Sequence, residues 1–328
     1  MSTALLDIKK LSVSFKTDRG PLKVISGLSL DIKKSEVFGL VGESGCGKSL
    51  TALSIMGILP NNAFAEGEVF FNDRDLLALS DAEMRRIRGK DMAMIFQEPM
   101  TSLNPVLTIG YQIAEALTTH FDISGKDAMN RSVELLGAVK IPSPALRIKD
   151  YPHQMSGGMR QRVMIAMAIA CNPSLLIADE PTTALDVTIQ AQILALLQGL
   201  RRDMQMAVLL VTHDLSVISE QADRVAIMYA GKIMELADAR ELLSRPLHPY
   251  TVGLLDSLPV ARGTALKPIT GFVPTPDCFP EGCRFSDRCG EVIDECRRAE
   301  PELTEITKGH FVRCIKAVAS GELSIGGA

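Results

Sequence analysis

The sequence contains no apolar stretch long enough to cross a membrane. Its longest helical apolar run spans residues 163–171, whereas a bilayer needs about 18 residues or more. Residues 1–10 lack the apolar core of a signal peptide, so we expect the protein to be made and kept in the cytosol. No polybasic cluster favours direct lipid binding, so any membrane association has to come through a protein partner. The formal charge of −4, with no basic stripe, argues against nucleic acid as a partner.

Cysteine is scarce in most of the chain. Of seven cysteines, Cys46 and Cys171 stand alone, and the others crowd into the last fifth, at positions 278, 283, 289, 296 and 314. In a cytosolic protein such a cluster indicates a metal site more than a set of disulfides. From Cys283 the spacing C-x5-C-x6-C-x17-C matches neither the C-x2-C pairs of common zinc sites nor the ferredoxin pattern. The spacing alone leaves zinc, an iron–sulfur cluster or reduced thiols open.

The length of 328 residues suits one large domain and a smaller one. From about residue 240 prolines interrupt the pattern and the cysteines follow, which places a domain boundary there. Before it, apolar and polar stretches alternate in the manner of an α/β fold. We expect strands at 5–15, 22–32, 67–71, 92–96, 174–178 and 207–211, a hairpin at 224–235, and helices at 82–88, over most of 111–171 and after residue 186. The helical block at 111–171 reads as an insertion between two buried strands.

The stretch Gly42–Ser49, reading G-E-S-G-C-G-K-S, lies between an apolar run and an apolar helical segment. A strand, a glycine-rich turn and a helix in this order let backbone N–H groups converge on a phosphate, and the helix dipole adds positive charge. Lys48 is then placed to reach the β- and γ-phosphates of a nucleotide, and the Ser49 hydroxyl to ligate Mg²⁺. This stretch predicts a nucleoside-triphosphate site.

Acidic residues close the apolar strand at 174–178. Asp179 would hold Mg²⁺, directly or through water, and Glu180 would polarise an attacking water as a general base. In an open α/β sheet the carboxyl ends of the strands are where ligands bind, and Gln97 and His213 also follow strands. The run Ser156-Gly157-Gly158 precedes a helix beginning near residue 159 and predicts a second anion-binding helix terminus.

Taken in order, these stretches resemble the ATP-binding subunits of ABC transporters, over roughly residues 4–240. The matching motifs are the Walker A loop at 42–49, the Q-loop glutamine Gln97, the signature motif at 155–159, the Walker B strand at 175–179, the catalytic glutamate Glu180, the D-loop at 184–186 and the switch histidine His213. The signature departs from the common Leu-Ser-Gly-Gly-Gln by carrying Met155 and Met159 at its two ends. The resemblance implies a P-loop NTPase fold with a RecA-like core, an antiparallel β subdomain and an inserted helical subdomain at about 100–171.

The resemblance also implies which residues bind the cofactors ATP and Mg²⁺. Phe15 would stack on adenine, Gln97 and His213 would join Glu180 in catalysis, and each ATP would be sandwiched against the signature helix of another subunit. The implied Mg²⁺ ligands are Ser49, Gln97 and Asp179. The implied ATP contacts are Phe15, Gly42, Ser44, Gly45, Cys46, Gly47, Lys48, Ser49, Leu50, Asp179, Ser156, Gly157 and Gly158.

Residues 96–105, the motif His248-Pro249-Tyr250-Thr251 and the cysteine-bearing tail resemble the oligopeptide/dipeptide/nickel importer branch. This implies a C-terminal extension at 241–328, with a [4Fe–4S] cluster on Cys283, Cys289, Cys296 and Cys314 and zinc as the alternative. It further implies a distinct second ATPase subunit, two integral-membrane permeases and, indirectly, an extracytoplasmic peptide-binding protein. The expected role is to power di- or oligopeptide import from the cytoplasmic face of the inner membrane. Nickel or another small solute, or a soluble non-transport ABC ATPase, are the alternatives.

Overall fold

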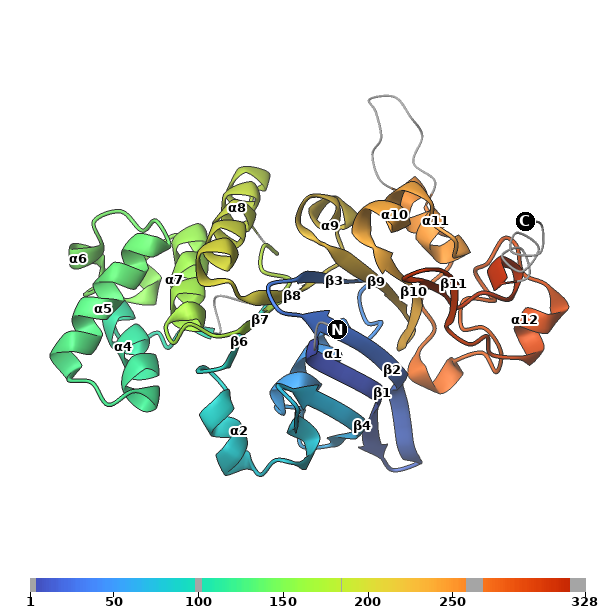
Figure 1. Ribbon diagram of the computed structural model, residues 1–328, viewed down its shortest axis with the longest axis horizontal. Coiled ribbons are helices and arrows are strands. Elements are labelled where there is room, and N and C mark those ends of the chain that lie inside the picture. Colours follow the sequence, from blue (N-terminus) through green and yellow to red (C-terminus); the bar gives the residue numbers. More distant parts are fainter. Residues whose placement is uncertain (1–3, 98–101, 184, 258–267, 319–328) are drawn as a thin grey trace. The chain divides into compact units, whose positions relative to one another are not determined.

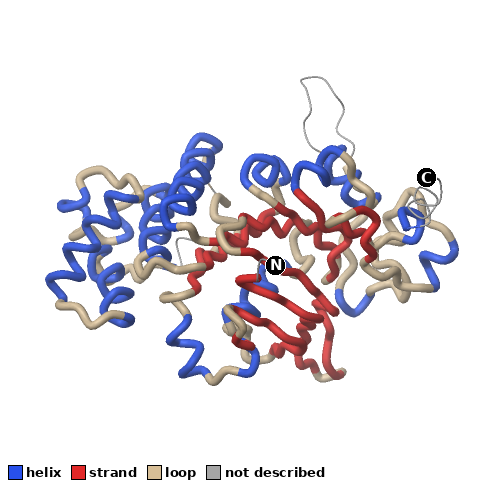
Figure 2. Tube along the Cα trace, in the orientation of Figure 1, coloured by secondary structure: helices blue, strands red, loops and turns tan. Residues whose placement is uncertain are grey.

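The computed structural model describes residues 4–97, 102–183, 185–257 and 268–318. They form two compact units: a strand-rich unit from the described parts of 6–32, 37–77 and 211–318, and a helical unit from those of 4–5, 33–36 and 78–210. Figures 1 and 2 show the elements of both units. Among the described residues, no helix combines the length and the apolar character that a membrane crossing requires.

Part of the strand-rich unit is a four-stranded sheet in the order β2-β1-β4-β5. Its strands are β1 (Ala4–Thr17), β2 (Gly20–Lys33), β4 (Ala63–Phe71) and β5 (Arg74–Asp75). β1 and β4 are antiparallel, and their register shifts between Lys9 and Ser12. Gly67 lies at this irregularity with φ 109°, and a Cβ there would come within 2.7 Å of the Lys10 carbonyl oxygen. We expected the strand to begin at Gly67; it begins at Ala63, because the bulge lets it continue past the glycine.

The remaining strands of this unit run in the order β11-β12-β10-β9-β3. They are β3 (Val37–Val41), β9 (Arg224–Tyr229), β10 (Lys232–Asp238), β11 (Thr304–Thr307) and β12 (His310–Val312). β3 and β9 are parallel, and β3 is buried along its whole length, as suits a strand covered on both faces. The expected hairpin is present as antiparallel β9 and β10. The hairpin of β11 and β12, which we did not expect, joins the edge of β10 with Leu236 opposite Phe311.

Short helices complete the strand-rich unit. They are α1 (Lys48–Met56), α9 (Leu215–Gln221), α10 (Ala239–Ser244), α11 (Pro249–Asp256) and α12 (Asp294–Arg298), with 3-10 turns η1 (Leu76–Ala78) and η3 (Pro276–Cys278). α1 begins at Lys48, within the last two residues of the glycine-rich stretch, so the expected helix is present and starts slightly early. The C-terminal region is therefore built into the same unit as that stretch.

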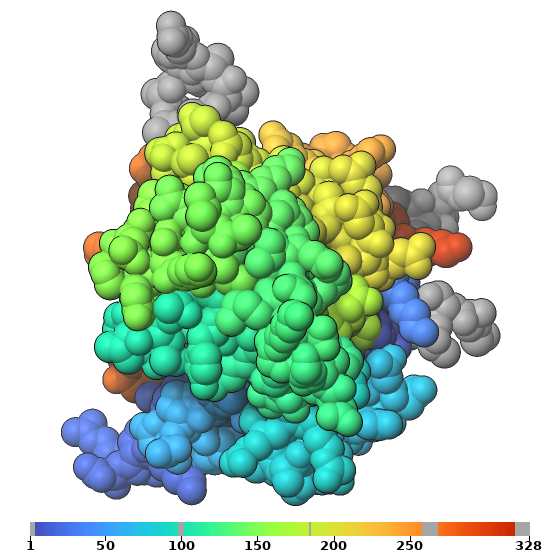
Figure 3. Space-filling view, turned by 90° about the vertical axis from the view of Figure 1, so that its left-hand side faces the viewer, coloured from blue at the N-terminus to red at the C-terminus, as the bar shows by residue number. Residues whose placement is uncertain are grey.

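The helical unit carries three buried strands in the order β8-β7-β6. They are β6 (Met92–Ile95), β7 (Leu175–Asp179) and β8 (Ala207–Thr212), of which β6 and β7 are parallel. Its helices are α2 (Asp81–Ile87), α4 (Ile109–His120), α5 (Gly125–Ala138), α6 (Pro144–Arg147), α7 (Gly157–Ile169) and α8 (Val187–Met204), with the 3-10 turn η2 (Pro152–Gln154). α4 packs against α5 and α7. The green residues, which include α5 and α6, occupy the middle of the face turned to the viewer in Figure 3.

Candidate nucleotide-binding site

The glycine-rich stretch forms a loop between the end of β3 and the start of α1. Gly45 and Gly47 have φ values of 80° and 111°, which favour glycine. A Cβ on Gly42 would come within 2.1 Å of the Met228 carbonyl oxygen on β9, so no side chain fits there. The Gly231 N–H donates to the Cys46 carbonyl at 2.8 Å and fixes the loop to the β9–β10 turn. The loop is thus shaped by residues far away in the sequence.

Lys48 is the first residue of α1 and is only 5% exposed. Its Nζ donates to the carbonyl oxygens of Gly42 at 2.8 Å and Glu43 at 3.1 Å. The ammonium is therefore held against the loop, beside the α1 N-terminus. A buried cation next to a helix N-terminus is an arrangement suited to binding phosphate. Ser49 and Leu50 follow in the first turn of α1.

Cys46 is fully buried in this loop. Burial raises the pKa of its thiol, against the opposing charge of Lys48, whose Nζ lies 4.0 Å from the sulfur. A buried, protonated thiol is a poor nucleophile. The burial of this thiol therefore gives no support for a redox role of Cys46.

In the helical unit the polar residues at the ends of β6 and β7 meet. The Gln97 amide donates to Glu180 Oε2 at 3.0 Å, and the Thr183 hydroxyl donates to the same oxygen at 2.9 Å. Asp179, the last residue of β7, is 4% exposed. Two donors therefore orient the Glu180 carboxylate next to a buried aspartate, an arrangement that can position a general base. Glu180 also has a φ of 45°, which is unusual for a residue other than glycine.

The signature stretch caps α7. Ser156 is its N-cap, and the Ser156 Oγ accepts from the Met159 N–H at 3.4 Å. α7 begins at Gly157, slightly before the expected start near Met159. A Cβ on Gly158 would come within 2.9 Å of the Ile189 side chain of α8, whereas Ser156 and Gly157 are exposed. This helix terminus is open to a ligand from outside the unit.

The other predicted residues lie in several places. His213 is exposed just beyond β8, and Phe15 is half-buried on β1, opposite Ala63 of β4. Asp186 of the D-loop is the N-cap of α8 and accepts from the Ile189 N–H at 2.9 Å. Residues 98–101 of the importer-branch stretch, and residue 184 of the D-loop, lie outside the described residues.

Three residues near the loop were given no role by the sequence. The Glu43 N–H donates to the Tyr250 hydroxyl at 3.1 Å. The two terminal nitrogens of Arg288 donate to the two carboxylate oxygens of Glu43, at 2.6 and 3.1 Å. Tyr250 belongs to the His-Pro-Tyr-Thr motif, so the motif itself was a usable signal. Nothing in the sequence linked Arg288 to the loop.

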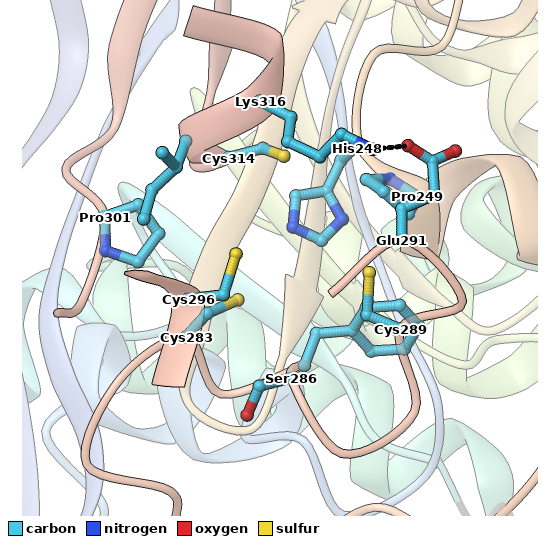
Figure 4. Close-up of a pocket in the computed structure, with 12 residues that line it drawn as sticks. His248, Pro249, Cys283, Ser286, Cys289, Glu291, Cys296, Pro301, Cys314 and Lys316 are labelled. Atoms are coloured by element: carbon cyan, nitrogen blue, oxygen red, sulfur yellow. Dashed lines mark hydrogen bonds and ion pairs between the residues drawn. The ribbon is translucent and has the colours of Figure 1, made fainter. Parts of the chain in front are cut away.

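Four of the C-terminal cysteines line one pocket, shown in Figure 4. They are Cys283, Cys289, Cys296 and Cys314, and their sulfur atoms face a common space. The pKa of Cys283 is raised to about 11, mainly by burial and to a smaller extent by the neighbouring thiols Cys296, Cys314 and Cys289. Cys278 is exposed and does not line the pocket.

Neither metal expected at these cysteines is confirmed. In the part of the chain that the structure describes, no group of three or more His, Cys, Asp or Glu side chains is arranged to hold a metal ion. What the structure does confirm is that the four cysteines come together, from segments separated by up to 31 positions (314 − 283).

The phosphate loop, the α/β sheets and the capped signature helix define a P-loop ATPase of the ABC class. Residues 25–183 match the family described as ABC transporter, and residues 234–296 match the oligopeptide/dipeptide transporter C-terminal region. The ATP-binding cassette MJ0796, in a dimeric post-hydrolysis state bound to ADP and Pi, has a TM-score of 0.64 and 28% identity, covering 72% of this chain and 99% of that one.

Relatives of known role are similar over nearly the whole chain. The oligopeptide transport ATP-binding protein AppD of Bacillus subtilis is 50% identical, covering 96% of this chain and 97% of the relative. The dipeptide transport ATP-binding protein DppD of the same organism is 50% identical over 94% of each chain. OppD of Escherichia coli, an oligopeptide transport ATP-binding protein, is 46% identical over 96% of this chain and 94% of its own. The chain belongs to the ABC ATP-binding subunits of oligopeptide and dipeptide transporters.

Proposed function

We propose that this chain hydrolyses ATP to power the import of di- or oligopeptides across the cytoplasmic membrane. The observation that carries the ATPase role is the Glu180 carboxylate, oriented by Gln97 and Thr183 at the end of β7. The peptide cargo is supported by the roles of AppD, DppD and OppD, to which the chain is similar over nearly its full length.

The proposed roles follow from chemistry and position. Lys48 and the loop amides bind the phosphates, and Glu180 accepts a proton from the attacking water. His213 contacts the γ-phosphate, and Phe15 stacks on adenine. The proposed Mg²⁺ ligands are Ser49, Gln97 and Asp179, whose oxygen donors suit this hard cation. A bound Mg²⁺ would neutralise charge that develops on the phosphates.

The second half of each site comes from another subunit through Ser156, Gly157 and Gly158. The exposure of Ser156 and Gly157 supports this. So does the dimeric structure of MJ0796, a bacterial ABC transporter cassette with a TM-score of 0.63 and 28% identity. The proposed partners are a distinct paralogous ATPase and two permeases that receive peptide from an extracytoplasmic binding protein. The chain would sit peripherally at the cytoplasmic face of the inner membrane.

The proposed layout is an ABC nucleotide-binding domain at 1–240, with its helical subdomain at about 100–171, followed by a cysteine-rich extension at 241–328. Cys283, Cys289, Cys296 and Cys314 would ligate a [4Fe–4S] cluster. Four thiols around one pocket suit a multi-iron cluster. Zinc, for which four thiolates are also a common ligand set, is the alternative at the same cysteines. When bound, the cluster would cross-link the segments that carry its ligands.

The ATPase role is tested with Glu180→Gln in the assembled transporter. We expect ATP to bind as in the wild type while turnover stops, because the amide cannot take a proton from water. Retained hydrolysis would rule out Glu180 as the base. A screen for ATPase stimulation by dipeptides, oligopeptides and nickel, delivered by the binding protein, then tests the cargo. Stimulation by nickel alone would replace the peptide assignment.

The cluster is tested by anaerobic purification of the full chain, with iron and acid-labile sulfide measured. We expect both in the wild type and in Cys278→Ser, whose thiol lies outside the pocket, and their loss in Cys289→Ser. A wild-type protein free of iron and sulfide would exclude the cluster.

A further inference from the structure

Glu43, the second residue of the phosphate loop, is attached to the C-terminal region at two points. Its backbone N–H donates to the hydroxyl of Tyr250, a fully buried residue of α11. Its carboxylate receives two parallel contacts from Arg288, of 2.6 and 3.1 Å. The Arg288 side chain is 5% exposed and that of Glu43 is 32% exposed. A bidentate, largely desolvated pair of this kind is directional and far stronger than a surface salt bridge.

Arg288 is fixed by contacts other than Glu43. Its Nε donates to the Thr270 carbonyl at 2.9 Å, and a terminal nitrogen donates to the Ile269 carbonyl at 3.4 Å. The guanidinium also lies 5.6 Å from the centre of the Tyr229 ring, within the range of a cation–π contact. Because the guanidinium is anchored independently, it can hold the loop at Glu43.

The same segment leads directly to the cysteine pocket. Arg288 lies in the turn between Cys283 and Cys289, where the Ser286 N–H donates to the Cys283 carbonyl at 2.9 Å and the Arg288 N–H to the Phe285 carbonyl at 3.0 Å. Phe285 lines the pocket and is 2% exposed. Its ring packs 5.2 Å from those of Tyr229 and Tyr250. The pocket and the phosphate loop are thus joined through one turn and one aromatic cluster.

We propose that Arg288 is a positioning residue for ATP, through which the state of the four-cysteine pocket sets the nucleotide affinity of the phosphate loop. The proposal rests on the proposed function, in which this loop binds ATP and the cysteines ligate a cluster. Arg288 neutralises a carboxylate that would otherwise repel the phosphates of ATP, and it fixes the loop at its second residue. Disorder in the turn from Cys283 to Cys289 would move Arg288 away and free the Glu43 carboxylate, so the affinity of the loop for ATP would fall.

The first test measures the Kd of a fluorescent ATP analogue with the full-length chain. Arg288→Gln should weaken binding about tenfold, the effect expected from losing a hydrogen bond to a charged group. Glu43→Gln removes the carboxylate that Arg288 holds and should weaken binding too, but by less, because the charge that repels ATP is removed with it. The double variant should bind no more weakly than Arg288→Gln alone, because both substitutions break the same contact. Arg298→Gln is the matched control, since Arg298 is 79% exposed and pairs only distantly with Asp294.

Two results would overturn the positioning role. One is wild-type affinity in Arg288→Gln. The other is a double variant whose loss is the product of the two single losses, which would show that Arg288 does not act through Glu43. Arg288→Lys keeps the charge without the bidentate grip and should fall between the wild type and Arg288→Gln. It also provides a milder variant if Arg288→Gln does not fold.

The second test compares Cys289→Ser with Cys278→Ser, each made in the wild type and in Arg288→Gln. Cys289→Ser should weaken ATP binding in the wild type and add nothing in Arg288→Gln, whereas Cys278→Ser should change neither. A Cys289→Ser protein that loses its iron but keeps wild-type affinity would refute the coupling and leave the cluster standing. A wild type without iron would exclude the cluster, while the Arg288 and Glu43 variants would still decide the positioning role.

Discussion

The chain presents two helix N-termini suited to anions, and their surroundings differ. At α1 the cap is Gly47, with no side-chain hydrogen bond, and the neighbouring Lys48 is almost completely buried. At α7 the cap is a serine hydroxyl, and Ser156 and Gly157 are exposed. The first terminus is enclosed by distant parts of its own chain, including Tyr250 and Arg288. The second is left exposed, which suits the proposed role in which it contacts an ATP held by another subunit.

Lys48→Ala should impair phosphate binding at the first terminus, the N-terminus of α1. It removes the buried cation beside the loop, so ATP binding and turnover should both fall about 100-fold or more, the usual loss when one charge-stabilising donor is removed. ATPase rates and analogue binding measure the effect. Lys34→Ala, at an exposed lysine in the turn before β3, is the control and should behave as the wild type. Equal losses in both variants would contradict the role of Lys48.

Ser156→Ala should affect the second terminus only in the assembly. We expect turnover of the transporter to fall about tenfold, since the proposed hydrogen bond from the Ser156 hydroxyl to the ATP phosphates is lost. ATP binding to the isolated chain should stay unchanged. The substitution also removes a helix cap, so Ser124→Ala is the matched control. Ser124 caps α5 in the same way, with its hydroxyl accepting from the Asp127 N–H at 3.1 Å. Equal losses of turnover would mean that only helix stability matters.

Tyr250→Phe should slightly weaken ATP binding at the first terminus, because it removes one anchor of the phosphate loop. The substitution keeps the buried ring but leaves the Glu43 N–H without its acceptor, so ATP affinity should fall about fivefold, equivalent to roughly 1 kcal/mol. Titration with an ATP analogue measures the effect. The same change at Tyr111, which is 50% exposed, should have none. An unchanged Kd in Tyr250→Phe would mean that the loop does not need this anchor.

The stability of the C-terminal region, which encloses the N-terminus of α1, should depend on pH. His310 of β12 contacts Glu235 at 2.7 Å and Glu241 at 3.3 Å. Burial alone lowers the pKa of His310, but its hydrogen bonds and ion pairs with the two carboxylates raise it above its usual value. Because the folded-state pKa is raised, this stability is present below about pH 6.5 and is lost as pH rises through the folded pKa.

Thermal unfolding across this pH range should show a Tm lower by about 1–2 °C on the alkaline side, since about 1 kcal/mol shifts Tm by roughly that much in a chain of 328 residues. His310→Gln should remove that pH dependence. A pH dependence that persists in His310→Gln would assign the effect to another group. On the acidic side His248 contributes: burial lowers its pKa to about 4, so the stability from this neutral imidazole is lost as pH falls from about 6.5 through that value.

Local chemistry made much of the site predictable. The loop at Gly42–Ser49 and the cap at Ser156 follow from the residue types at those positions, and the structure has both. The buried strand ending at Asp179 was likewise evident from its apolar run. What the sequence could not provide is pairing between distant positions. Glu43 and Arg288 lie 245 positions apart, and no periodicity or spacing connects them.

The hairpin of β11 and β12 was missed for a related reason. Its strands have only four and three residues, and β11 is partly exposed, so neither produces a clear apolar alternation. They form because the edge of β10 offers backbone partners. The crowding of the cysteines in the last fifth of the chain indicated a metal site, but the choice of these four came from the family resemblance, since their spacing fits no common metal motif.

The backbone of Glu180 has a consequence for how this position can change. A φ of 45° costs a residue with a Cβ about 1–2 kcal/mol, which glycine avoids. Glycine at 180 would relax the chain but abolish the carboxylate that Gln97 and Thr183 orient. Selection for a more stable fold and selection for turnover therefore oppose each other at this residue. Thermostable variants obtained without an activity screen should often carry glycine in place of Glu180.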